Sequence, residues 1–177
     1  LYDVQTQWIA DNAAALNLKY VLHEGDITND NNFTQWSNAS ASMAILDNAG
    51  VPYALAPGNH DYGPSGNGAN RNTFLHTYFP MSRVAAAAGF GGSFDPVRVD
   101  NTWHEFHAWG RDWLILALEF GPRDAVLAWA DQVITAHPDH QVLVVTHCYT
   151  STQGVRVDHL HRPDIGGGPH NYGMASL

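Results

Sequence analysis

Short apolar runs alternate with segments of helical periodicity along most of this 177-residue chain. Residues 20–22 and 53–56 are typical of short buried strands, and residues 142–146 form a β-branched run that predicts a third. No internal repeat and no long linker divides the chain. This alternation favours one α/β domain over residues 1–177, with mostly parallel inner strands.

Three segments have the periodicity of amphipathic helices: residues 3–17, residues 33–47, and a stretch from Pro122 to about His137. The first helix is expected to bury one apolar face, made of Val4, Trp8, Ile9, Ala13 and Leu16. Proline suits the first turn of a helix, so Pro122 is expected to lie inside the third one.

A second pattern of strands is predicted between these helices. Residues 102–107 and 113–118 are expected to pair across a turn at residues 109–112. The small and Gly-rich residues 85–95 are instead expected to form a surface loop.

Potential metal ligands stand at the ends of the three buried strands. Asp26 follows the first strand, Asn59 and His60 follow the second, and His147 follows the third. In α/β sheets, ligands bind beyond the carboxyl ends of the strands. Carboxylate, amide and imidazole groups suit divalent ions such as Mn, Fe, Zn or Mg. The pattern therefore predicts a metal site where the strand ends converge.

Each element taken alone also has a structural interpretation. Asp26 after a Gly suits a cap, residues 58–61 consist largely of turn-forming residue types, and a single His147 after a strand is usually a packed side chain. Asp61 is expected to orient its own loop through hydrogen bonds. From residue types alone, ligand and structural roles both remain open.

Charge narrows the possible functions. The chain has a formal net charge of −9 with 8 Lys and Arg, which argues against nucleic acid as a partner, since such binding neutralises phosphates with basic side chains. A protein of this charge that handles phosphate needs positive charge from elsewhere, and metal ions can supply it.

The single Cys148 excludes an intramolecular disulfide. No apolar run reaches the length of a membrane span, and the scarcity of Lys leans towards an extracytoplasmic location.

Taken together and in this order, the strand-end elements resemble the calcineurin-like metallophosphoesterase superfamily. Residues 20–29, Tyr-Val-Leu-His-Glu-Gly-Asp-Ile-Thr-Asn, resemble its Gly-Asp element. Residues 57–61 match its Gly-Asn-His-Asp element without a substitution, and residues 144–147 are similar to its His element. Residues 113–124 resemble a connecting segment of a bacterial branch, so that the resemblance covers roughly residues 1–150.

This resemblance implies an α/β/β/α sandwich of mixed sheets flanked by helices, with the site at one edge. It implies hydrolysis of phosphate mono- or diesters by a centre of two divalent metal ions, with a small phosphoester as substrate. Asp26 would bridge both ions, while Asn59 and His147 would bind the second. His60 would contact the phosphate and act as general acid.

Two elements of the superfamily, an initial Asp-x-His or Asp-x-Gln and a final Gly-His-x-His, have no match in the chain. The resemblance places them before Leu1 and after Leu177, so the domain is expected to be incomplete at both ends. His159-Leu160-His161 lacks the preceding strand and Gly of the final element. The alternative hypothesis is a non-catalytic binding module with an incomplete metal site. A nuclease is disfavoured by the negative charge.

Other polar residues receive structural interpretations. Position 29, often Asp in related phosphoprotein phosphatases, is Asn29, which argues against a carboxylate partner for His60. His104 and His107 on the predicted strand pair are expected to be packing or surface residues. Glu119 also follows a strand, and a structural role is expected for it as well.

Overall fold

The computed structural model describes residues 2–64, 66, 68 and 70–150. Its elements in chain order are α1 (Tyr2–Asn12), β1 (Val21–His23), α2 (Phe33–Ala49), β2 (Tyr53–Leu55), the 3₁₀ helix η1 (Asn59–Asp61), α3 (Leu75–Tyr78), α4 (Met81–Val84), β3 (Phe90–Ser93), β4 (Thr102–Ala108), β5 (Arg111–Ala117), α5 (Asp124–Ala136) and β6 (Gln141–Val145). None of the helices in this described part has the length and apolar character that a membrane crossing requires.

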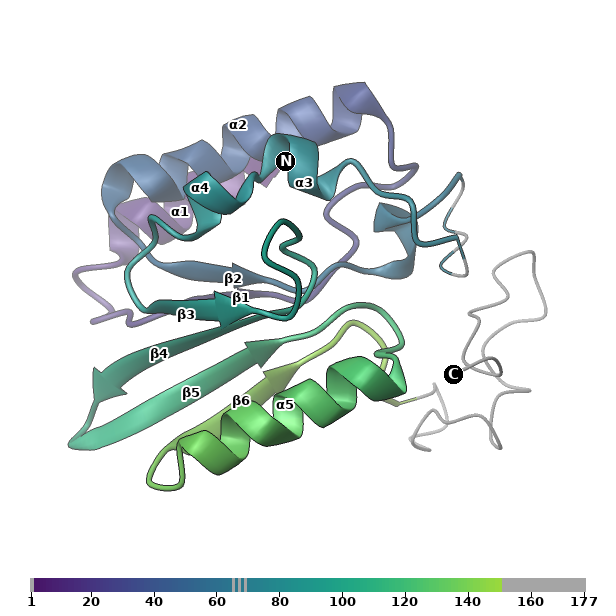
Figure 1. Cartoon of the computed structure of the whole chain (residues 1–177). Helices are drawn as coiled ribbons and strands as arrows, with labels where there is room; N and C mark the ends of the chain where they lie inside the picture. Colours follow the sequence, from purple (N-terminus) through teal and green to yellow (C-terminus); the bar gives the residue numbers. More distant parts are fainter. Residues whose placement is uncertain (1, 65, 67, 69, 151–177) are drawn as a thin grey trace.

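The elements form four layers. Helices α1 to α4 lie on one side of the parallel pair β1–β2, and α5 covers the far side of a second sheet with the order β3–β4–β5–β6 (Figure 1). In that second sheet, β3, β4 and β5 are antiparallel, and β6 runs parallel to β5. The predicted α/β/β/α sandwich of mixed sheets is therefore confirmed.

Strand β5 shows how the core connects the layers. Because side chains alternate across a strand, Leu114 and Leu116 pack against α5, in a cluster with Val126. Ile115 and Ala117 point the other way and pack in a cluster with Ala54 of β2 and Ala56 just after it. A third cluster, centred on Trp36 and Leu46 of α2, fills the space between the helices and β1–β2. Each side chain of this part of β5 is fully buried.

Helix α1 and the residues after it bury only part of the predicted face, since Ile9 and Ala13 pack against the core as expected while the rest of the predicted set does not. Val4, Trp8 and Leu16 are 64%, 58% and 57% exposed, whereas Thr6 is only 2% exposed. The side chains that pack against the core near α2 include Tyr2, Ile9, Ala10 and Ala13. Both sets follow a spacing near 3.6 residues, so periodicity alone cannot choose between them. The helix also ends at Asn12, before the predicted limit of residue 17.

A strand was missed in the segment predicted to be a surface loop. Strand β3 pairs with β4 despite its two central glycines, Gly91 and Gly92. A Cβ at Gly91 would collide with the Trp103 ring, and one at Gly92 would lie 2.8 Å from the Trp103 indole nitrogen. The glycines thus make room for an aromatic ring on the neighbouring strand, a requirement that only the tertiary structure reveals.

The remaining elements lie close to their predicted positions. Helix α2 begins after the N-cap Asn32, whose side chain accepts from the Gln35 N–H, and ends at Gly50 with φ of 65°. Helix α5 buries Val126, Ala130 and Val133 as expected. It begins at Asp124 after the N-cap Arg123, so Pro122 lies outside the helix rather than in its first turn.

His104 joins the two sheets. Its side chain is fully buried, and its two ring nitrogens lie 2.8 Å from the Tyr20 hydroxyl and 2.9 Å from the Thr102 hydroxyl. Burial lowers the pKa of His104 to about 4. The predicted packing role is confirmed, and His107 on the same strand is exposed as a surface residue.

This burial predicts a loss of stability in acid. Above pH 6.5 the His104 ring is neutral in both states, but below that pH the unfolded chain binds a proton that the folded chain excludes down to about pH 4. His104→Gln should therefore reduce the dependence of the unfolding free energy on pH between 6 and 4.5, by up to about 1 kcal/mol per pH unit. Urea unfolding at several pH values measures this. The control His107→Gln, at an exposed ring that pairs with Asp112, should change the slope much less than His104→Gln. Equal slopes for wild type and His104→Gln would contradict the prediction.

Candidate functional site

The chain segments that follow β1, β2 and β6 come into contact. Gly25 has φ of 102°, a left-handed conformation that L side chains rarely adopt. A Cβ there would lie 2.5 Å from His147 Nδ1 and 2.8 Å from the Gly58 amide nitrogen. A Cβ at Gly58 would collide with Asp26. Glycine at these two positions lets the three predicted ligand segments approach each other.

Asp26 and His147 form the centre of this arrangement. The Asp26 Oδ2 atom lies 3.4 Å from His147 Nε2, and both side chains remain partly exposed. His147 Nδ1 lies 2.7 Å from the main-chain carbonyl oxygen of Glu24. A carbonyl only accepts hydrogen bonds, so Nδ1 carries the hydrogen and Nε2 faces the carboxylate.

The two side chains shift each other's protonation. Burial would raise the pKa of Asp26, but the hydrogen bond and charge of His147 and the His60 N–H outweigh it, so that the pKa is lowered. The pKa of His147 is raised, chiefly by its hydrogen bond to Asp26, against the opposing effect of burial. Asp26 is consequently an ionised carboxylate at neutral pH, the form in which it binds cations.

Asn59 and His60 lie on η1, directly after β2. The His60 main-chain N–H donates to Asp26 Oδ1 at 3.1 Å, which ties this segment to the carboxylate. The His60 ring is held by a contact of 2.6 Å between its Nδ1 and the Asn29 carbonyl oxygen. Asn59 is 5% exposed, and its amide nitrogen lies 3.4 Å from the Gly66 carbonyl oxygen.

Asp61 fastens these loops together, as its predicted orienting role requires. Its fully buried carboxylate accepts from the main-chain N–H groups of Ile27 at 3.0 Å, Thr28 at 2.7 Å and Gly58 at 2.8 Å. The Thr28 hydroxyl donates a fourth bond at 3.0 Å. Burial raises the pKa of Asp61 to about 6, and these four donors stabilise its ionised form at neutral pH.

A cavity of about 400 Å³ opens beside Asp26 and His60. Its lining includes Asn29, Gln35 and Asn38, from the β1–α2 loop and from α2. Two of the four predicted site residues, Asp26 and His60, thus line this cavity, and its amide groups offer hydrogen bonds to a polar ligand.

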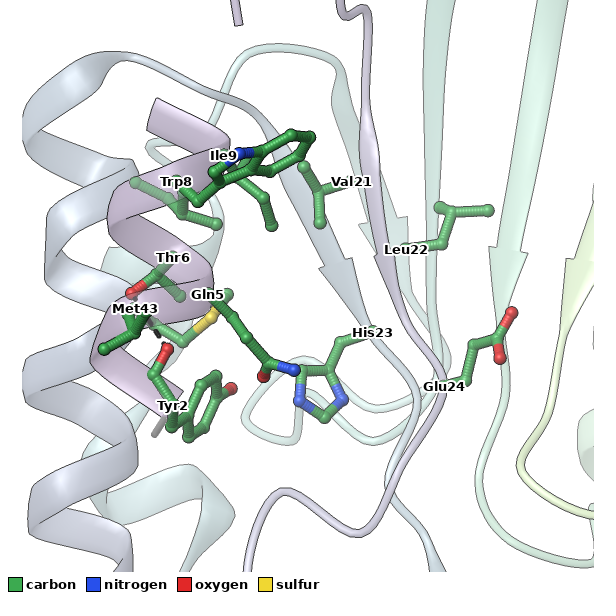
Figure 2. A pocket seen from close by; sticks show the side chains of 12 residues that line it. Tyr2, Gln5, Thr6, Trp8, Ile9, Val21, Leu22, His23, Glu24 and Met43 are labelled. Carbon is green, nitrogen blue, oxygen red and sulfur yellow. Dashed lines mark hydrogen bonds between the residues drawn. The ribbon is translucent and has the colours of Figure 1, made fainter. Parts of the chain in front are cut away.

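A larger cavity of about 610 Å³ lies between α1 and β1. Figure 2 shows Trp8, Ile9 and Val21 gathered at one end of it, and Tyr2 with His23 at the other. None of the four predicted site residues is among the described residues that line it. The smaller cavity is therefore the better candidate for the chemistry, because Asp26 and His60 line it.

The donor set fits a divalent cation in part. Two ligands bound to one ion at about 2.0–2.2 Å lie about 3–3.5 Å apart, and the Asp26–His147 separation of 3.4 Å falls in this range. A His that binds a metal almost always donates its other ring N–H to a carboxylate, a main-chain carbonyl or water, as His147 does to Glu24. Within residues 2–64, 66, 68 and 70–150, no group of three or more His, Cys, Asp and Glu side chains could hold a metal. Further donors among these residues would be amides, of which Asn59 is the predicted one.

Other predicted residues lie outside this arrangement. Glu119 is 1% exposed and bonded to Arg123 at 2.7 Å and Asn101 at 3.1 Å, in keeping with a structural role. The His159-Leu160-His161 segment lies outside the described residues. Sequence reasoning missed the carbonyl groups of Glu24 and Asn29, because a main-chain acceptor leaves no signal in residue type.

We predict that Asp61→Asn destabilises the protein by about 3 kcal/mol. The amide would turn its NH₂ group towards donors that the carboxylate now accepts from, and buried donors without an acceptor cost about 1–3 kcal/mol each. Urea unfolding at pH 7.5 measures the change. The isosteric substitution Asp131→Asn on the exposed side of α5 is the matched control and should have little effect. A variant as stable as wild type would show that these bonds do not hold the loops.

Comparison with known proteins shows the family of this chain. The family model for calcineurin-like phosphoesterases matches residues 2–164, a range that includes all four predicted site residues. The chain is also 37% identical over 157 residues to an uncharacterized protein of Bacillus subtilis (strain 168), YvnB. That match covers 88% of this chain but only 12% of YvnB. The chain thus belongs to the calcineurin-like phosphoesterase family.

Proposed function

We propose that this chain hydrolyses phosphate mono- or diesters with two divalent metal ions held at the strand ends. The observation that carries the proposal is the contact of 3.4 Å between Asp26 and His147. These residues are 121 positions apart in the sequence, and they follow β1 and β6, strands of different sheets. Asp26 would bridge the ions, and Asn59 and His147 would bind the second one. Mn, Fe, Zn and Mg all suit these donors.

Divalent cations held there would offset phosphate charge and activate water as the nucleophile. The chain's own residues prepare the site for this. Asp26 is kept ionised by His147 and by the His60 N–H. The Glu24 carbonyl orients the His147 ring so that Nε2 points towards Asp26.

His60 would act as the general acid. Its Nδ1 hydrogen is donated to the Asn29 carbonyl, so a proton to be transferred would be carried on Nε2. The ring lines the cavity of about 400 Å³ beside Asp26, where a phosphoester would bind. Donation of this proton would neutralise the alkoxide that leaves the phosphorus atom.

The alternative is a binding module that keeps the fold without catalysis. One observation favours it. Among the described residues, Asp26 and His147 are joined by no third carboxylate, thiolate or imidazole group that could bind the same metal ion. Metal content and turnover of the full-length protein separate the two hypotheses. A binding module would show no hydrolysis with any of the four metals.

We predict that His60→Ala lowers kcat of the full-length protein for a phenyl ester of phosphate with Mn²⁺ by about 10²–10⁴-fold. Its metal content should remain that of wild type, because the ring is proposed to act on the substrate. The exposed His107→Ala is the control and should retain wild-type kcat. Turnover untouched by His60→Ala would remove this residue from the mechanism.

A further inference from the structure

Gln35, in the first turn of α2, makes an unusual set of contacts with the loop that follows Asp26. Its side-chain Oε1 accepts from the main-chain N–H of Asn29 at 2.9 Å and of Asp30 at 2.7 Å. Its Nε2 donates to the Asp30 carboxylate at 3.0 Å. The Gln35 main chain is itself fixed, because its N–H donates to the N-cap Asn32. One side chain on a regular helix thus holds two consecutive peptide groups of the loop.

The same loop holds the ring of His60. The peptide unit between Asn29 and Asp30 carries the Asn29 carbonyl at one end and the Asp30 N–H at the other. Gln35 binds the N–H end, and His60 Nδ1 binds the carbonyl end at 2.6 Å. A peptide unit is planar and rigid, so orienting one end orients the other. A hydrogen bond at the N–H also polarises the carbonyl and strengthens it as an acceptor.

We propose that Gln35 is a positioning residue for His60, acting through the Asn29–Asp30 peptide unit. It keeps the carbonyl directed at Nδ1, and so selects the ring orientation in which Nε2 carries the proton for the leaving group. The inference rests on the proposed function, and it assigns to a backbone carbonyl the task of orienting the general acid. Asp30 serves the arrangement by fixing the other end of the Gln35 amide.

Leaving-group dependence separates this role from a merely structural one. A general acid matters for a poor leaving group and little for a good one, because a good one departs without a proton. In the full-length protein with Mn²⁺, Gln35→Ala should lower kcat for a phenyl ester of phosphate by about tenfold or more. For the matching 2,4-dinitrophenyl ester, kcat should change by less than about threefold, with KM and metal content unchanged. Gln132→Ala, on the exposed part of α5, is the control and should alter neither ester.

A reciprocal exchange tests the hydrogen bonds themselves. Gln35→Glu alone places two carboxylates together and should not restore the phenyl ester activity. Gln35→Glu combined with Asp30→Asn reverses the direction of one bond, keeps an acceptor for both N–H groups, and should restore it. Equal loss for both esters in Gln35→Ala, loss of metal, or no rescue by the double substitution would overturn the proposal.

A readout independent of turnover keeps the two hypotheses apart. Histidine-selective ¹⁵N NMR at alkaline pH, with His60 assigned through His60→Ala, reports which ring nitrogen carries the hydrogen. Wild type should show the Nδ1–H form, and Gln35→Ala should populate the Nε2–H form. An unchanged tautomer would overturn the positioning role. If Gln35→Ala shifts the tautomer but the wild-type protein hydrolyses no ester, the proposed function is contradicted while the positioning role is supported.

Discussion

The buried carboxylate of Asp61 is the interaction on which the geometry of the candidate site depends. A carboxylate without water is costly by several kcal/mol, and here four donors from two loops surround it. Ile27 and Thr28 follow β1, while Gly58 follows β2, so one charged group fixes the ends of two neighbouring strands relative to each other. The positions of Asp26 and His60, which flank these anchored residues, follow from that fixation.

A second feature is the use of main-chain carbonyls to orient imidazoles. His60 and His147 each direct Nδ1 at a carbonyl oxygen, from Asn29 and Glu24 respectively. A carbonyl selects one tautomer without adding charge, whereas a carboxylate in the same place would add a negative group beside a phosphate. In an acidic chain this difference matters for the proposed function, in which the site would bind an anionic phosphoester.

Three arginines of the described part of the chain are already engaged by the protein itself. Arg71 donates to the carbonyl groups of Phe120 and Gly121, Arg98 pairs with Asp100, and Arg123 pairs with Glu119. These contacts stabilise the loops around β5 and compete with any role in binding phosphate. Together with the net charge of −9, they make bound cations the most direct source of positive charge for a phosphoester.

The sequence by itself determined the order of the strand-end residues, the family and the layered α/β architecture. Those features depend on local patterns. A β-branched run such as residues 142–145 favours a strand, and turn-forming residues such as 58–61 favour a turn, wherever they occur in a chain. The buried face of α5 was predictable for the same reason, because the helix has only one apolar face.

Only the tertiary structure decided the face that α1 buries, the presence of β3 and the partners of the two site histidines. Helix α1 carries two stripes of similar spacing, and packing against α2 selects the one with Thr6. Strand β3 needs glycine because the Trp103 ring lies over it. The acceptors for His60 and His147 are main-chain atoms, which every residue type possesses. Their role therefore arises from the path of the folded chain, and no pattern of side chains could have revealed it.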